Sequence, residues 1–176
     1  MKMVFPTIAY KDKAIDFIHE FYDYSSEIHG SGGLDRMLKE ATYEEWLLKL
    51  QRDMDIANIP NPRVPALTYF YVRETDDRIV GTVNIRLVPG GELIHTVGHI
   101  GYSVRPTERR KHYGTELLKA ALEVCRTIGI KNVIIACERS NMASAGVIRN
   151  CGGVLESEFF SDSYNEILQR YMIRLD

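Results

Sequence analysis

The sequence predicts a mixed α/β fold, in which helices cover both faces of a mostly antiparallel sheet that contains one parallel strand pair. Strand-like and helix-like patterns alternate along the chain in the order β-α-α-α-β-β-β-α-β-α-β-β. One continuous stretch, residues 97–128, combines a strand, a short basic loop and a long amphipathic helix. A helical crossover of this kind places the next strand parallel to the first one.

The strand of this central stretch is expected at residues 97–104, which alternate and include β-branched and aromatic side chains. Pro106 ends the strand, because proline has no N–H group to donate to a ladder. Apolar residues then recur at three- and four-residue steps over residues 114–128, which is typical of a helix with one buried face. Gly129 follows, where a helix C-terminal glycine is expected.

The other elements follow from the same two periodicities and from turn residues between them. Helices are expected at residues 12–24, 34–40, 43–54 and 141–148, and strands at residues 3–8, 66–73, 79–87, 132–137, 154–160 and 167–175. Thr42 and Glu45 have the spacing of a capping box at the start of the third helix. Residues 132–137 are continuously apolar, which suits a strand buried on both faces.

Three stretches rich in glycine or proline are expected to be connections: residues 25–33, 59–65 and 89–91. The glycines of residues 25–33 also raise the alternative of a phosphate-binding loop. That stretch follows no apolar strand and lacks the Lys-Ser/Thr pair of a P-loop, so a mobile loop is the better interpretation.

Length and composition favour a globular protein with one domain, residues 1–176. Hydrophobic residues make up 45% and charged residues 26%, and the net charge of −2 gives no basic field to attract nucleic acid or anionic lipid. The three cysteines are odd in number and lack metal-ligand spacing, which indicates reduced thiols. No apolar run reaches the ~20 residues of a membrane span, and no signal peptide is evident. We therefore expect a cytoplasmic protein without a metal site.

A basic loop, Arg109-Arg110-Lys111-His112-Tyr113-Gly114-Thr115, joins the central strand to its helix. A helix N-terminus offers unpaired N–H groups and the positive end of the helix dipole. Gly114 lets an anion approach those groups, and three consecutive cations add attraction and forked hydrogen bonds. The pattern indicates a phosphate or pyrophosphate cradle; the alternative is an ordinary connection with solvated charges.

The motif Arg109-x-x-His112-x-Gly114, followed by Thr115, resembles the pyrophosphate loop of the GNAT superfamily of N-acetyltransferases. The usual form of that loop is Arg/Gln-x-x-Gly-x-Gly/Ala, so His112 stands in the place of the first glycine. Residues 102–106 before the loop, and residues 141–153 after it, are similar to the neighbouring segments of the family. The resemblance covers roughly residues 97–153.

The resemblance implies that the parallel strands splay apart and that acetyl-CoA, the cosubstrate, enters between them. The free edge of the central strand would bind the pantetheine arm, the loop would bind the pyrophosphate, and Asn141 would contact pantetheine from the other side. The cofactor-binding residues implied are Tyr102, Ser103, Val104, Arg109, Arg110, Lys111, His112, Tyr113, Gly114, Thr115, Asn141 and Ser144.

The implied reaction is direct transfer of an acetyl group to a primary amine of a small molecule or protein. A base must remove a proton from the ammonium form, and an acid assists the departing thiolate. His99 is the candidate base, because an imidazole titrates near neutral pH; the alternative is a hydrogen-bonded strand residue, and Glu138 is the second candidate. Ile148 stands where the family usually has a tyrosine that acts as the general acid. Tyr164 or Tyr171 would then donate the proton instead, or the thiolate would leave unassisted.

Two other function classes remain open. A catalytically weak acyl-CoA-binding module is favoured by Ile148, whereas a nucleic-acid-binding domain using residues 105–111 is disfavoured because aromatic and basic residues do not interleave. Acceptor contacts are expected from residues 22–35 and 159–164, which contain aromatic and acidic side chains. A homodimer is compatible with the sequence.

Overall fold

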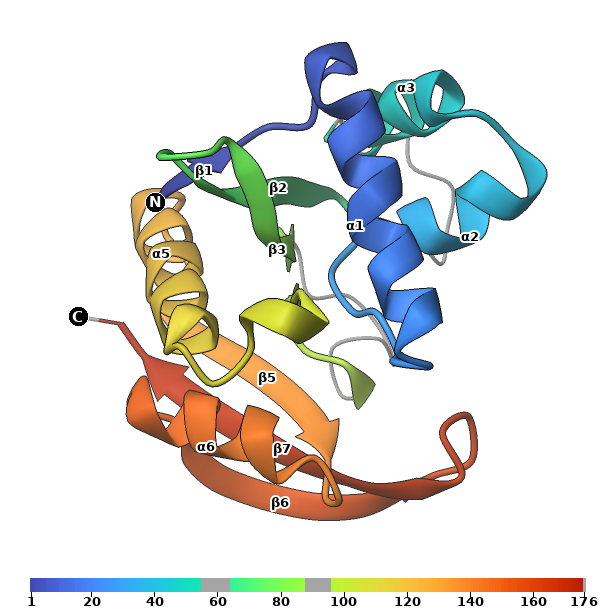
Figure 1. Ribbon diagram of the computed structural model, residues 1–176. Coiled ribbons are helices and arrows are strands. Elements are labelled where there is room, and N and C mark those ends of the chain that lie inside the picture. Colours follow the sequence, from blue (N-terminus) through green and yellow to red (C-terminus); the bar gives the residue numbers. More distant parts are fainter. Residues whose placement is uncertain (55–63, 88–95, 176) are drawn as a thin grey trace.

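The computed structural model describes residues 1–54, 64–87 and 96–175, whose strands form two sheets (Figure 1). The first sheet has the order β1-β2-β3-β4 and the second has the order β5-β7-β6. The strands are β1 (Lys2–Val4), β2 (Ala66–Arg73), β3 (Arg78–Arg86), β4 (Ile100–Val104), β5 (Asn132–Glu138), β6 (Val154–Ser161) and β7 (Glu166–Arg174). Strands β4 and β5 therefore lie at the edges where the two sheets meet.

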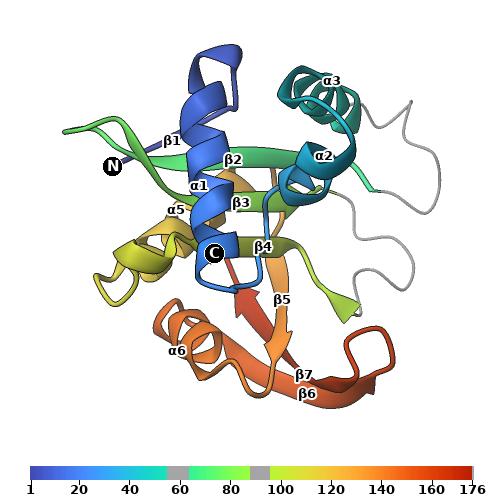
Figure 2. The same cartoon turned by 45° about the vertical axis from the view of Figure 1, so that its right-hand side comes forward.

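The helices lie on both faces of the first sheet (Figures 1 and 2). Helices α1 (Lys11–Asp23), α2 (Leu34–Glu40) and α3 (Tyr43–Asp53) cover one face. Helix α5 (Tyr113–Thr127) covers the other face, and α6 (Met142–Asn150) packs near it against the second sheet. Within the described residues, none of the helices combines the length and the apolar character that a membrane crossing requires.

Two hydrophobic cores lie on opposite faces of the first sheet. The first core joins Tyr71, Val83 and Ile85 to the buried faces of α5, α6, β5 and β7. The second core joins Phe70, Val72 and Ile79 to the buried faces of α1 and α3. In β2, Tyr71 thus enters one core and its neighbours Phe70 and Val72 enter the other, as the period-two geometry of a strand requires. In β3, a register shift skips Val80, so Ile79 enters the second core although it lies an even number of positions from Val83 and Ile85.

The predicted mixed α/β fold is confirmed, with shifts at several element ends. Thr42 and Glu45 form the expected capping box. The central strand begins at Ile100 rather than at residue 97, and the first strand ends at Val4, before a 3-10 helix at Ile8–Tyr10. The predicted connections at residues 59–63 and 89–91 lie outside the described residues.

The expected parallel strand pair is not found as a ladder, since every ladder among the described residues is antiparallel. One isolated antiparallel bridge, between Gly98 and Ile135, joins the two sheets. Next to it, the backbone N–H of His99 donates to the carbonyl oxygen of Ile134 at 2.7 Å. The backbone N–H of Ile134 in turn donates to Nδ1 of the His99 ring at 3.0 Å. The imidazole thus replaces a backbone acceptor, and β4 and β5 separate beyond this point.

We expect His99→Ala to destabilise the fold by about 1–3 kcal/mol, because Ile134 would keep a buried N–H without an acceptor. Chemical denaturation measures this cost, and His19→Ala on the exposed side of α1 is the control, with an expected change within about 0.5 kcal/mol.

The same site predicts a pH dependence. Burial lowers the pKa of His99 below its ordinary value of 6.5, so the folded protein favours the neutral ring. This contribution to stability is present above pH ~6.5 and is lost as the pH falls, because the unfolded chain then binds the proton more readily. A denaturation series from pH 7.5 to 5 should show a steeper loss for the wild type than for His99→Ala. Equal slopes would contradict this account.

Candidate functional site

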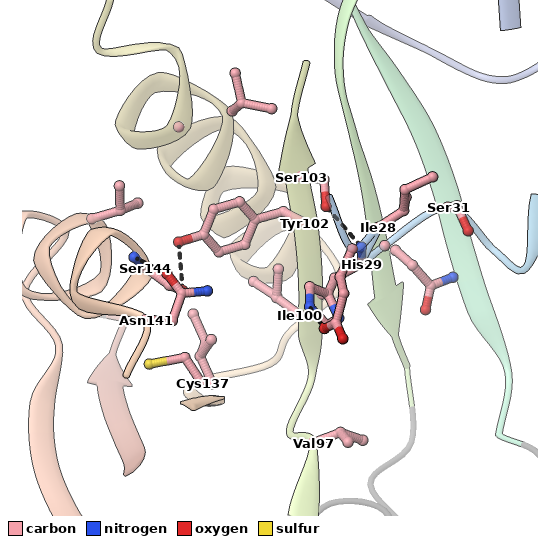
Figure 3. A pocket seen from close by; sticks show the side chains of 18 of the residues that line it. Ile28, His29, Ser31, Val97, Ile100, Tyr102, Ser103, Cys137, Asn141 and Ser144 are labelled. Carbon is pink, nitrogen blue, oxygen red and sulfur yellow. Dashed lines mark hydrogen bonds and ion pairs between the residues drawn. The ribbon is translucent and has the colours of Figure 1, made fainter. Parts of the chain in front are cut away.

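A cavity of about 1470 Å³ opens beside the separated edges of β4 and β5 (Figure 3). It is lined by the loop that follows α1, by β4, by the first turn of α5, and by the end of β5 with the start of α6. Tyr164 and Glu166, near the turn between β6 and β7, line it as well. The cavity thus lies where the sequence predicted cofactor binding.

One edge of β4 directs backbone groups away from β3. The N–H of Arg105 donates to Val80 of β3 at 2.8 Å, and alternate residues of a strand direct their backbone groups to the same side. Tyr102 and Val104 therefore direct their N–H and C=O groups toward the side of β5. The Val104 carbonyl oxygen accepts a hydrogen bond from Nε of Arg109 at 3.1 Å. The other backbone groups of these two residues are available to an extended ligand.

The basic loop ends in a helix start without a side-chain cap. Arg110 and His112 adopt left-handed conformations, with φ of 60° and 64°. Helix α5 begins at Tyr113, one residue earlier than expected, and no side chain caps its N-terminus. A Cβ atom at Gly114 would lie 3.3 Å from Cγ2 of Val147, so glycine lets the first turn of α5 lie close to α6. Tyr113, Gly114 and Thr115 of this turn line the cavity, and the first N–H groups of a helix have no partner within the helix, as an anion site requires.

The three cations of the loop have different roles. The Arg109 guanidinium donates to Val104 and, at 2.7 Å, to Oγ of Ser26, and burial lowers its pKa. Lys111 forms an ion pair with Glu108 at 2.9 Å and does not line the cavity. Arg110 is exposed, lines the cavity and has no ion pair within the described ranges. Arg110 is therefore the cation best placed to meet an anionic ligand.

A buried ion pair fixes the chain just before this loop. Arg105 is only 1% exposed, and its guanidinium donates to the Ile79 carbonyl and to carboxylates of Asp16 and Glu20 on α1. Burial alone would raise the pKa of Glu20, but hydrogen bonds from Thr107 and Arg105 lower it below its ordinary value. The ionised carboxylate thus ties α1 to the start of the loop.

Most of the predicted cofactor-binding residues meet at the cavity. Those that line it are Tyr102, Ser103, Val104, Arg109, Arg110, His112, Tyr113, Gly114, Thr115, Asn141 and Ser144. Lys111 lies outside the lining, as described above. His99, the candidate base, also lies outside: it is 3% exposed and its ring binds Ile134. This placement favours the alternative interpretation of His99 as a hydrogen-bonded strand residue.

The loop after α1 is held against β4 by specific contacts. The backbone N–H of His29 donates to Oγ of Ser103 at 2.7 Å (Figure 3). Oγ1 of Thr82 donates to the Gly30 carbonyl oxygen at 3.0 Å. Gly30 has a φ of +74°, and a Cβ atom there would lie 2.1 Å from the carbonyl oxygen of Gly101. Only glycine allows this approach, which places the His29 ring at the cavity.

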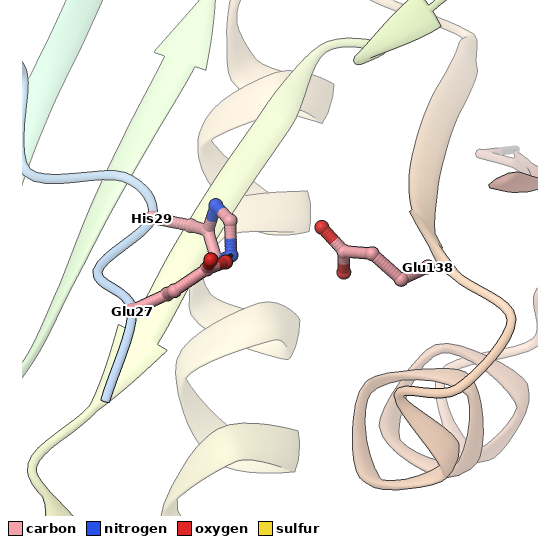
Figure 4. Close-up of side chains that lie close together, drawn as sticks. All are labelled: Glu27, His29 and Glu138. Atoms are coloured by element: carbon pink, nitrogen blue, oxygen red, sulfur yellow. Dashed lines mark ion pairs between the residues drawn. The ribbon is translucent and has the colours of Figure 1, made fainter. Parts of the chain in front are cut away.

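Glu27, His29 and Glu138 face one another across the cavity mouth (Figure 4). Their ligand atoms lie within 4.8 Å of one another, and Nε2 of His29 is 3.7 Å from Oε2 of Glu27. Glu138 was the second candidate base. Glu27 and His29 lie within residues 22–35, where acceptor contacts were expected, but neither was singled out as a catalytic residue. Carboxylates and imidazole can ligate a divalent cation, and they can also receive a protonated amine.

A second polar pair joins β4 to α6 at the cavity. The hydroxyl group of Tyr102 lies 3.2 Å from Oγ of Ser144, and either atom can donate (Figure 3). Ser144 belongs to the first turn of α6, where its backbone N–H donates to Oδ1 of Asn141 at 3.0 Å. The sequence predicted a backbone role for Tyr102, and its side chain was missed, because strand periodicity does not identify the helix that the ring meets.

The other predicted proton donors differ in their access to the cavity. Tyr164 lines it, but Tyr171 is 1% exposed and donates to Oε1 of Gln169 at 2.8 Å, outside the lining. Ile148 is fully buried. Of the two predicted acceptor regions, residues 26–33 and 35 line the cavity in the first, and Tyr164 lines it in the second.

Several solved acetyltransferases are similar to this chain in fold. Ribosomal-protein-S5-alanine acetyltransferase from Vibrio fischeri matches with a TM-score of 0.67 at 15% identity, over 98% of this chain and 91% of that one. The putative acetyltransferase yncA from Salmonella typhimurium, solved with its cofactor acetyl-CoA, matches with a TM-score of 0.67 at 14% identity, over 99% and 94%. A spermidine N-acetyltransferase SpeG chimera of Vibrio cholerae and human SSAT sequence matches with a TM-score of 0.64 at 14% identity, over 99% and 96%. At these identities the likeness shows the fold.

Comparison with curated proteins gave no match. A family model, however, matches residues 32–152, which is more than half of the chain and includes β4, the basic loop, α5 and α6. Its description is the acetyltransferase (GNAT) family. The chain therefore belongs to the acetyltransferase (GNAT) family.

Proposed function

We propose that the protein transfers the acetyl group of acetyl-CoA to a primary amine in the cavity between β4 and β5. The main support is the outward-facing edge of β4, which leads directly to the uncapped N-terminus of α5. An extended pantetheine arm can pair with a strand edge, and a pyrophosphate suits a helix N-terminus. The family and its acetyl-CoA-bound structural neighbour agree with this assignment.

In this proposal, Tyr102 and Val104 hold the amide groups of the pantetheine arm through their backbones. The N–H groups of Tyr113, Gly114 and Thr115 bind the pyrophosphate, and Arg110 adds a charged contact. Asn141 and Ser144 face the arm from α6. The Lys111 side chain takes no part, because it pairs with Glu108.

The proposed acceptor is a cationic primary amine that enters beside Glu27, His29 and Glu138. Two carboxylates attract an ammonium group, and the His29 imidazole can remove its proton, since imidazole exchanges protons near neutral pH. Among the structural neighbours are a spermidine N-acetyltransferase and an acetyl transferase from Salmonella typhimurium that modifies the N-terminal serine of ribosomal protein L7/L12. Both small-molecule and protein amines therefore belong in the acceptor screen.

The second candidate function is a catalytically weak acyl-CoA-binding module. It is favoured by Ile148, a buried side chain without a proton to donate. The two functions differ in one measurement: release of free CoA thiol when the protein is mixed with acetyl-CoA and a panel of amines. Multiple turnover with any amine supports the enzyme, and tight CoA binding with no thiol release supports the module.

We expect Arg110→Ala to raise the dissociation constant for CoA about 10-fold, because a charge-assisted hydrogen bond is worth about 1.5–3 kcal/mol. Lys111→Ala is the charge-matched control. It lies next to Arg110 but is paired with Glu108, so we expect a change below ~3-fold. Isothermal titration calorimetry measures both constants. An equal change of the CoA dissociation constant in the two variants would show that Arg110 makes no specific contact with CoA.

We expect His29→Gln to lower kcat/KM for the amine by about 100-fold, because a general base typically contributes 10²–10⁴-fold. The acidic limb of the pH–rate profile should also disappear. CoA affinity should stay unchanged, since His29 belongs to the acceptor side of the cavity. If His29→Gln retains wild-type turnover, Glu138 becomes the base to test; if chelation of divalent cations abolishes wild-type turnover, the three side chains hold a metal instead.

A further inference from the structure

We propose that Tyr102 is the catalytic acid of this site and that Ser144 restores its proton. The inference rests on the proposed acetyl transfer and adds the group that protonates the departing thiolate of CoA. It is needed because Ile148, fully buried in the core beneath α6, offers no proton.

The geometry of the pair supports this role. The Tyr102 side chain extends from β4 toward the first turn of α6, and its hydroxyl group meets Oγ of Ser144 at 3.2 Å (Figure 3). Both residues line the cavity. The backbone of Tyr102 lies on the strand edge proposed to hold pantetheine. Its phenol therefore lies near the path along which the thioester at the end of that arm would enter.

The surroundings keep the phenol protonated. Burial raises the pKa of Tyr102 far above its ordinary value of 10, and the bond to Ser144 offsets this only in part. A protonated phenol can donate a hydrogen bond to a thioester sulfur and then its proton to the thiolate. The nearby N-terminus of α6 contributes positive potential, which stabilises negative charge on the sulfur or the phenolate oxygen.

The other groups with exchangeable protons are less suited. Tyr171 lies outside the cavity lining and donates to Gln169. Cys137 lines the cavity, but burial raises its pKa to about 11, and its sulfur is a weak hydrogen-bond donor. Tyr164 is on the turn between β6 and β7 and belongs to neither β4 nor α6, the two elements proposed to enclose the pantetheine arm. Tyr102 is the phenol that joins the two elements proposed to enclose the pantetheine arm.

The proton balance of the step is complete. After the base has taken one proton from the ammonium group, the nitrogen lone pair forms the C–N bond to the carbonyl carbon. The C–S bond breaks, and its electron pair goes to sulfur, which takes the phenolic proton of Tyr102 and leaves as the thiol. The nitrogen, now positively charged, releases a second proton, which returns to the phenolate through the Ser144 hydroxyl. The products are the amide and CoA.

The test compares acetyl donors with different leaving groups in wild type, Tyr102→Phe and Ser144→Ala. With acetyl-CoA, Tyr102→Phe should lower kcat about 100-fold, while the dissociation constant of CoA changes less than ~3-fold. With 4-nitrophenyl thioacetate, whose thiolate leaving group is stable without a proton, kcat of the same variant should fall less than ~5-fold. A structural defect would reduce both rates equally.

Tyr171→Phe is the matched control, because it removes a buried phenol that does not line the cavity, and its kcat should stay within ~3-fold of wild type. Ser144→Ala should lower kcat about 10-fold at saturating acetyl-CoA, and it provides the test if Tyr102→Phe folds poorly. Wild-type kcat in Tyr102→Phe, an equal loss with both donors, or a larger loss in Tyr171→Phe would overturn the inference. A wild-type protein that binds CoA but acetylates no amine would instead defeat the proposed function itself.

Discussion

The His99 imidazole takes the place of a backbone acceptor at the junction of β4 and β5, where the pairing of the two sheets stops and the cavity begins. The ring satisfies the N–H of Ile134 without extending the ladder, so the two sheets are joined by a single bridge within the described residues. Buried backbone groups must be paired, and the strands can therefore separate only where something else takes those bonds. At the junction, the His99 ring accepts the hydrogen bond of the Ile134 N–H group. Farther along β4, the proposed cosubstrate would bind the free backbone groups.

A second constraint, the buried Arg105 guanidinium, places the anion site relative to this gap. Removing one partner of a buried ion pair is costly, because the remaining charge stays desolvated. Arg105 joins α1, β3 and the residue before Pro106, and Arg109 then ties the loop back to Val104. Of the loop's three cations, Arg109 binds Val104 and Ser26 and Lys111 pairs with Glu108, so Arg110 is left to meet a ligand at the cavity. The local charge pattern alone could not distinguish these roles.

Much of the fold could be predicted because periodicity and turn residues are local properties. The capping box at Thr42 and the helix near Gly114 depend on neighbours within a few positions, and the structure places the start of α5 within one residue of the predicted start. The separation of β4 from β5 was implied by the family resemblance and not by periodicity, whereas the Glu27–His29–Glu138 group and the Tyr102–Ser144 side-chain pair were not predicted. Each depends on which side chains meet across elements far apart in the chain, and in a loop such as residues 26–33 no periodicity indicates where a side chain points.

The central claim is that the outward edge of β4 binds the cosubstrate, and amide hydrogen exchange tests it residue by residue. The Ser103 N–H faces β3 and should already be protected in the free protein. The N–H groups of Tyr102 and Val104 face the cavity, so we expect them to exchange freely without ligand and to slow at least ~10-fold when CoA is saturating. Unchanged exchange at both positions, with CoA bound by calorimetry, would contradict the account and place the ligand elsewhere.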